Sequence, residues 1–166
     1  MIKRMGFAAG ASLALALGSG AAAQPAGTTN PGLRVDAEQM INRCIRPADR
    51  QRPFRSFTAA QRQRIVACLQ AEAGRQLNLQ LPASIDNVTR LVRVTTRGTE
   101  LTYHYSLAVR RADLPAGVAG QLEASTRANV CAQPPMRQTM EYGGSYGYRW
   151  LDSAGLIVHQ IHIAGC

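Results

Sequence analysis

Apolar and polar residues alternate most clearly between positions 101 and 109. The apolar set shares one side of an extended chain: Leu101, Tyr103, Tyr105, Leu107 and Val109. The residues on the other side are Thr102, His104, Ser106 and Ala108. A period of two with one apolar side is typical of a half-buried β-strand. We therefore expect a strand here, with the following part of the chain pairing with it or covering its apolar side.

Three further segments have the same strand-like period. In residues 88–95, Val88, Arg90, Val92 and Val94 alternate with Thr89, Leu91, Arg93 and Thr95. The corner Arg97-Gly98-Thr99 suits a tight hairpin that leads into the strand at 101–109. Residues 145–150 and 156–163 are joined by the turn-like sequence 152–155 and predict a second hairpin. The sequence thus predicts about four strands in one antiparallel sheet.

Helical spacing appears in three places. Residues 35–45 predict a short helix, and residues 58–77 predict a longer one with Thr58 as its N-cap. The segment 48–57 between them reads as a loop. Residues 115–131 predict a third helix, which Pro134-Pro135 ends before a short turn at 136–142. The predicted fold class is α+β: a helical hairpin precedes a sheet that carries helices on one face.

The amino-terminal end has the pattern of a secretory signal peptide. Lys3 and Arg4 precede an apolar run at 7–17, and Ala21-Ala22-Ala23 follows as a cleavage site. The run is shorter than the roughly 20 residues that a membrane-spanning helix needs. We expect a signal peptide at 1–23, a flexible lead-in at 24–34 and one domain at 35–166. Within that domain, 35–78 forms the helical hairpin and 81–166 the sheet and helix. The predicted location is periplasmic or secreted.

The chain is strongly basic. Without Lys3 and Arg4, its 19 cationic residues become 17, all arginine, against ten acidic residues, which leaves a net charge of about +7. Guanidinium groups bind phosphate and carboxylate through paired hydrogen bonds, so the charge is compatible with an anion-binding surface. An ordinary solvated surface in an arginine-rich protein is the alternative, because no compact run of cations with interleaved aromatics occurs. The candidate binding arginines of the helical hairpin are Arg43, Arg46, Arg62 and Arg64.

Four cysteines in an exported chain favour disulfides over a metal site. Of the three possible pairings, we expect Cys44 with Cys68, which joins the first two helices, and Cys131 with Cys166, which joins the third helix to the last strand. A redox site or a four-thiolate zinc site lacks the necessary spacing, because no C-x-x-C occurs.

Candidate chemistry on the sheet is sparse. If the two hairpins are neighbours, His104 shares the open face of the sheet with Arg149 and with either Gln160 or His162, and these residues form a small cationic patch. The alternative is that they are the ordinary polar residues of a solvent-exposed sheet face. His159 falls on the apolar side. No H-E-x-x-H motif is present, and Gly143-Gly144-Ser145-Tyr146-Gly147 lacks the strand-then-helix context of a phosphate loop. We expect no cofactor and no metal. The strand aromatics form either the floor of a ligand pocket or core: Tyr103, Tyr105, Tyr146, Tyr148 and Trp150.

Several short patterns, taken together, resemble a known family. They are Leu81-Pro82-x-x-Ile85-Asp86-x-x-Thr89-x-Leu91, Leu101-Thr102-Tyr103-x-Tyr105, Asn129-Val130-Cys131, and Gly144-x-Tyr146-x-Tyr148-x-Trp150-x-Asp152 with Gly155, Ile161, Ile163 and Cys166. The chain from Leu81 to Cys166 resembles a family of small exported proteobacterial proteins of unknown function. The resemblance implies the α+β sheet and the Cys131–Cys166 pair, and it implies no activity.

Three functional hypotheses follow. The leading one is a non-enzymatic interaction module that binds a protein or another envelope component. The alternative is a binder of anionic polymer or lipid head groups through the arginines between Arg43 and Arg75. The third is an enzyme whose site is assembled from scattered residues such as His104, Arg149 and His162.

Overall fold

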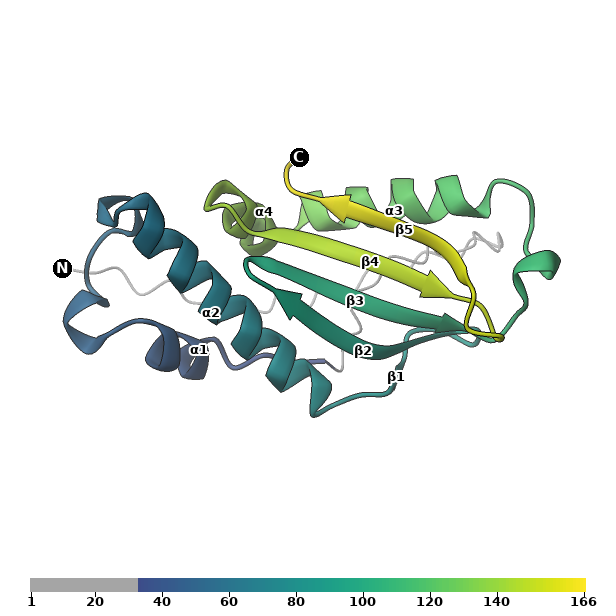
Figure 1. Cartoon of the computed structure of the whole chain (residues 1–166), viewed down its shortest axis with the longest axis horizontal. Helices are drawn as coiled ribbons and strands as arrows, with labels where there is room; N and C mark the ends of the chain where they lie inside the picture. Colours follow the sequence, from purple (N-terminus) through teal and green to yellow (C-terminus); the bar gives the residue numbers. More distant parts are fainter. Residues whose placement is uncertain (1–32) are drawn as a thin grey trace, which may run out of the picture.

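The computed structural model describes residues 33–166 as a five-stranded sheet with four α-helices (Figure 1). The strands follow one another across the sheet in chain order: β1 (Ala83–Ser84), β2 (Thr89–Arg97), β3 (Glu100–Leu107), β4 (Ser145–Leu151) and β5 (Ile157–Ile163). The expected signal peptide at 1–23 and residues 24–32 of the expected lead-in lie outside the described residues.

The sheet corrects the predicted topology in two respects. It has five strands instead of four, because β1, which is only two residues long, pairs with β2 and is too short to show a period. It is also mixed: β3 and β4 are parallel, whereas the other neighbours are antiparallel. The reason is the helical connection between β3 and β4, which returns the chain to the end of the sheet at which β3 begins.

The four helices are α1 (Ala37–Cys44), α2 (Ala59–Asn78), α3 (Val118–Ala132) and α4 (Pro134–Glu141). Thr58 caps α2 as expected, in a reciprocal capping box with Gln61. The expected loop at 48–57 contains two short 3₁₀ turns, Pro47–Asp49 and Phe54–Ser56. The expected short turn at 136–142 is the two-turn helix α4, which starts at Pro134 because proline is well tolerated at the first helical position.

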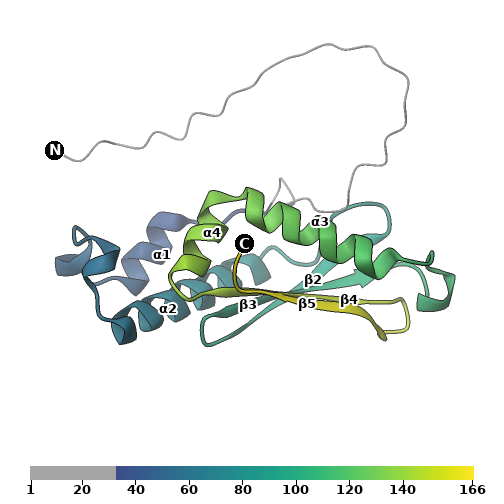
Figure 2. The same ribbon diagram turned by 90° about the horizontal axis from the view of Figure 1, so that it is seen from above.

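The helices pack on one face of the sheet. Figure 2 shows α3 lying over the strands, while α2 packs against the β2–β3 end. A Cβ added at Gly74 of α2 would lie 3.0 Å from Cγ2 of Thr96 and 3.3 Å from Cδ1 of Leu101, so the absence of a side chain there lets α2 approach the strands closely. We call the opposite side, which no described helix covers, the helix-free face.

Strand register assigns each residue to one of these two faces, because directly paired residues point to the same side of a sheet. The core side includes the rows Leu91–Tyr105–Trp150–His159, Val94–Tyr103–Tyr148–Ile161 and Thr96–Leu101–Tyr146–Ile163. The helix-free face has the rows Arg93–His104–Arg149–Gln160 and Thr95–Thr102–Gly147–His162.

A β-bulge in β2 corrects the predicted alternation of that strand. The register shifts between Leu91 and Arg93, so Leu91 and Val94 are both buried in the core while Val92 between them is exposed. A bulge adds one residue to one strand of a pair and thereby breaks the period of two. Simple alternation therefore placed Val92 on the same side as Val94 and Leu91 on the other.

Two disulfides join the pairs expected from the sequence. Cys44 at the end of α1 is bonded to Cys68 of α2, and Cys131 of α3 is bonded to Cys166, beyond the end of β5. Each bond links elements that are distant in the chain, and each restricts the unfolded chain.

Candidate functional site

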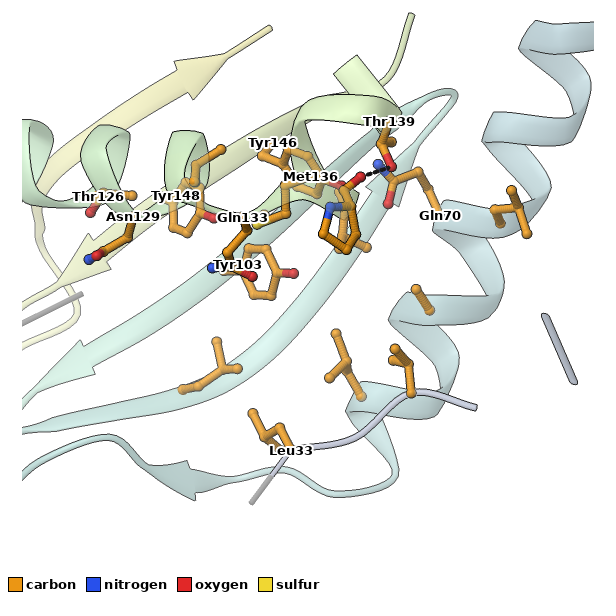
Figure 3. Close-up of a pocket in the computed structure, with 18 of the residues that line it drawn as sticks. Leu33, Gln70, Tyr103, Thr126, Asn129, Gln133, Met136, Thr139, Tyr146 and Tyr148 are labelled. Carbon is orange, nitrogen blue, oxygen red and sulfur yellow. Dashed lines mark hydrogen bonds between the residues drawn. The ribbon is translucent and has the colours of Figure 1, made fainter. Parts of the chain in front are cut away.

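A cavity of about 670 Å³ lies between α2, the α3–α4 pair and the core face of the sheet. We call it the groove. Figure 3 shows part of its lining, with side chains from β3, β4, α2, α3 and α4 pointing toward a shared space. Its volume is in the range of ligand-binding sites in proteins.

The floor of the groove is aromatic. Tyr103 and Tyr105 of β3 lie beside Tyr148 and Trp150 of β4 because the two strands are paired in parallel register. The ring centroids of Tyr105 and Trp150 are 5.7 Å apart, in a stacked arrangement. Burial raises the pKa of Tyr103, Tyr105 and Tyr148, so these phenols stay neutral at any physiological pH.

The two walls differ in chemistry. The α2 wall is mainly apolar and includes Val66, Leu69, Ala73 and Leu77. The α3 wall presents Thr126 and Asn129, which are three residues apart and so lie on one face of the helix, and Gln133 follows at the junction of α3 with α4. Figure 3 shows these three side chains in sequence along the groove. The groove is therefore apolar with a polar line along one side.

Gln70 adds a polar group to the α2 wall. Its side chain is 4% exposed, and its Nε2 is buried without a hydrogen-bond partner among the described residues. Burial raises the pKa of Tyr146, which also lines the groove. A buried amide donor of this kind is usually satisfied in native proteins, so an acceptor on an occupant of the groove would satisfy Nε2 of Gln70.

The first described residues lie at one end of the groove, where Leu33 and Val35 contribute to the lining. Gln80 of the chain after α2 holds this segment on both sides of Arg34: its Oε1 accepts from the Arg34 N–H at 3.0 Å, and its Nε2 donates to the Arg34 carbonyl at 2.6 Å. Gln76 accepts from the Asp36 N–H at 2.6 Å. Side-chain amides thus hold an extended backbone at the edge of the groove.

The candidate arginines of the helical hairpin do not gather into an anion site. Arg43 lies 3.7 Å from Glu72, and Arg46 pairs with Asp49 at 2.9 Å. Arg62 donates to the Phe57 carbonyl at 2.6 Å. In a separate contact, Arg64 donates to the carbonyl of Ala60 at 3.4 Å. Carboxylates and backbone carbonyls of the hairpin therefore engage all four guanidinium groups.

The structure does bring His104 and Arg149 together, as paired neighbours on the helix-free face. His104 is buried there, with 6% of its surface exposed, which differs from the open position expected for it. Its Nε2 lies 2.8 Å from Oγ1 of Thr95. Burial, and then the nearby charges of Arg93 and Arg149, lower the pKa of His104, so the ring is neutral at pH 7.

The other two histidines lie apart from His104. His162 is in the next row of the helix-free face, and its Nδ1 lies 3.0 Å from Glu100. His159 lies on the core side, as expected, where it stacks on Trp150 and approaches Glu123 at 3.4 Å. Across residues 33–166, no three His, Cys, Asp or Glu side chains are grouped so that they could hold a metal ion. None of the helices in this range has the length and apolar character to cross a membrane.

The groove itself was only partly visible in the sequence. The strand aromatics were interpreted as either core or the floor of a pocket. The structure buries Tyr146, Tyr148 and Trp150 in the core cluster, and all five aromatic rings also line the groove. The walls of the groove could not be predicted from the sequence. An apolar stripe such as Val66, Ala73 and Leu77 predicts that α2 packs against another element, but it does not predict a cavity. Positions 126 and 129 fall within the helix predicted at 115–131 and position 133 lies just beyond it, and no local pattern shows that these polar residues line a cavity.

Comparisons with known proteins locate the fold. No protein-family model matches the chain, and no curated protein does. Among solved structures, the fold is similar to that of EpsS, a pilotin from the type 2 secretion system of Vibrio vulnificus, with a TM-score of 0.56 and 12% identity over 63% of this chain and 92% of that one. It is also similar to the type II secretion system pilotin AspS from Vibrio cholerae, with a TM-score of 0.51 and 19% identity over 63% and 93% of the two chains. At these identities the likeness shows a shared fold.

Proposed function

We propose that this chain is an exported, non-enzymatic interaction module that binds an apolar segment of an envelope protein in the groove. The observation that carries the proposal is the groove itself, a cavity of about 670 Å³ with an aromatic floor and a largely apolar wall. Apolar surfaces of this kind that remain accessible in a folded domain commonly serve binding.

The lining favours a polypeptide over a compact small molecule. The polar groups of Gln70, Asn129 and Gln133 come from α2, from α3 and from the junction of α3 with α4, and they are distributed along the groove instead of converging on one point. A polypeptide segment offers apolar side chains together with repeated polar groups, so it matches such a distribution. An amphipathic helix laid in an apolar groove is a common form of this recognition.

Two further observations support an envelope role. Both disulfides suit an oxidising compartment, in agreement with the expected signal peptide. The similarity in fold to two pilotins of type II secretion systems supports a partner within an envelope assembly. The groove holds no arrangement of nucleophile, base and acid that would favour an enzyme, and His104, the centre of the enzymatic hypothesis, lies on the other face of the sheet.

Site-specific photocrosslinking tests the proposal. A photoreactive side chain replaces Met136, which lines the groove, or Gln121, an exposed residue of α3 that serves as the matched control. We expect a discrete protein adduct from position 136 in an envelope extract at both low and high salt, because apolar contacts are not screened by ions. Equal adducts from the two positions, or none from position 136, would overturn the proposal.

A groove variant makes the same experiment specific. Met136→Glu places a charge among apolar side chains, whereas Gln121→Glu adds the same charge on the solvent side of α3. With the photoreactive group moved to Leu69 on the opposite wall, we expect the adduct to disappear in Met136→Glu and to persist in Gln121→Glu. An adduct that persists in both variants would place the partner outside the groove.

A further inference from the structure

The helix-free face of the sheet carries an excess of positive charge. Strand register and the alternation of side chains place four arginines on this face: Arg90, Arg93, Arg97 and Arg149. Glu100 is the only acidic residue in the five strands, and its carboxylate is already engaged by His162 at 3.0 Å and by the Thr102 hydroxyl at 2.7 Å.

The remaining carboxylates do not neutralise this face. All ten acidic residues of the chain fall within residues 36–152. Asp49 and Glu72 pair with arginines of the helical hairpin, and Asp86 and Asp152 accept backbone N–H groups in turns. Across residues 33–166, none of the four arginines of the helix-free face is in an ion pair. Their charge is therefore available to a ligand.

Arg149 supplies a more specific observation. Its Nε is buried and has no hydrogen-bond partner within the described part of the chain. Arg93 and Arg149 are the neighbours of His104 in one row of paired residues. The uncharged ring of His104 therefore has one arginine on each side. An oxyanion placed between them would accept hydrogen bonds from both.

Exposed apolar side chains accompany these charges. Ile157 is 41% exposed and pairs with Leu151, which follows the core residue Trp150 and so lies on the helix-free face. Val92, at the bulge beside Arg93, is 38% exposed. Leu156, in the turn that leads into β5, is 60% exposed. A basic surface with exposed apolar residues is typical of proteins that lie on anionic membranes.

We infer that the helix-free face docks on the surface of an anionic phospholipid bilayer. Arg90, Arg93, Arg97 and Arg149 contact the lipid phosphates, to which guanidinium groups donate paired hydrogen bonds. Val92 and Ile157 enter the headgroup region. The groove lies on the other side of the sheet, so it stays open to a protein partner while the domain is docked, and the two proposals stand independently.

Vesicle co-sedimentation of residues 24–166, which contain every described element and both disulfides, tests the inference. The probes are phosphatidylcholine vesicles with and without phosphatidylglycerol. We expect binding only with phosphatidylglycerol, and weaker binding as salt rises. Arg90→Gln/Arg93→Gln should reduce the binding about 30-fold, from about fivefold per arginine near an anionic surface. The control Arg55→Gln/Arg64→Gln removes the same charge from the helical hairpin and should bind nearly as the parent does.

The outcomes separate the alternatives. Equal losses in the two double variants would overturn the inference, because only net charge would then matter. Release from the vesicles by inorganic phosphate at low concentration and constant ionic strength would also overturn it, in favour of a discrete phosphate site. Met136→Glu should bind the vesicles unchanged, so failure of the groove proposal leaves this result intact. Circular dichroism confirms that each variant is folded.

Discussion

The rings of Tyr103 and Tyr148 stack across the parallel β3–β4 pair with their centroids 5.1 Å apart. This contact joins two segments that are separated in the chain by α3 and α4, and it forms the centre of the groove floor. The only parallel pair in the described sheet therefore creates the aromatic surface on which the proposed function depends.

The two tyrosines should contribute unequally to stability. Both rings border the cavity, but Tyr148 is buried in the core cluster, whereas Tyr103 is half-buried. We expect Tyr148→Ala to lower the free energy of unfolding by about 3 to 5 kcal/mol, the usual range for a large buried aromatic side chain. Tyr103→Ala should cost less, because the lost surface already faces open space. Urea unfolding at pH 7 measures both, and equal losses would contradict the lesser burial of Tyr103.

His104 should make stability depend on pH. Its pKa is lower in the folded protein than in the unfolded chain, so the unfolded chain binds the proton more tightly. The contribution of the neutral ring is fully present above the unfolded pKa of about 6.5 and is lost as pH falls toward the folded pKa. His104→Gln should therefore lose less stability than the parent between about pH 7 and about pH 5. Parallel curves for the two proteins would show that His104 is not the titrating group.

Glu72 should make the stability of the fold depend on pH in a more acidic range than His104 does. Hydrogen bonds from Arg75 and Gln76 lower the pKa of Glu72 to about 2. The ionised carboxylate stabilises the fold above the unfolded pKa of about 4.5, and this contribution is lost as pH falls toward about 2. Glu72→Gln should remove it and flatten the acid limb of the stability curve. The control is Glu141→Gln, at an exposed position of α4, which should keep the parent's pH dependence.

The two disulfides should contribute similarly to the unfolding equilibrium. Cys44–Cys68 and Cys131–Cys166 span 24 and 35 residues, for which loop entropy predicts about 3 to 4 kcal/mol each. We expect Cys44→Ser/Cys68→Ser and Cys131→Ser/Cys166→Ser to lower the free energy of unfolding by comparable amounts under oxidising conditions. A negligible loss in one variant would mean that packing alone fixes that pair of elements.

Most helices and strands could be predicted from the sequence, because the patterns that predict them depend on residues close together in the chain. The Thr58 cap and the tyrosine alternation in β3 and β4 each depend on neighbouring residues. The parallel pairing of β3 with β4 depends on where the α3–α4 connection returns the chain, which no local pattern encodes. The bulge at Val92 likewise arises from pairing, so alternation alone gave the wrong side for part of β2.

The groove and the helix-free face were harder to predict, because each combines segments that are distant in the sequence. The groove needs α2, α3 and β3–β4 in one place, and only its aromatic floor had a periodic signal. The excess of arginine was clear from composition, but its location was not. The sequence pointed to the helical hairpin, where Asp49, Glu72 and backbone carbonyls engage the candidate arginines. Four arginines that form no ion pair within the described residues lie instead on the helix-free face of the sheet, where strand register brings them together.

Trp150 gives the most direct test of the groove as a binding site. It is the only tryptophan in the chain, and its ring lies in the floor of the groove. The measurement is a fluorescence titration with a tryptophan-free segment of the protein crosslinked at position 136. We predict a saturable change in Trp150 emission for the parent and for Arg90→Gln/Arg93→Gln, and none for Met136→Glu. No change in the parent, or the same change in Met136→Glu, would contradict binding in the groove.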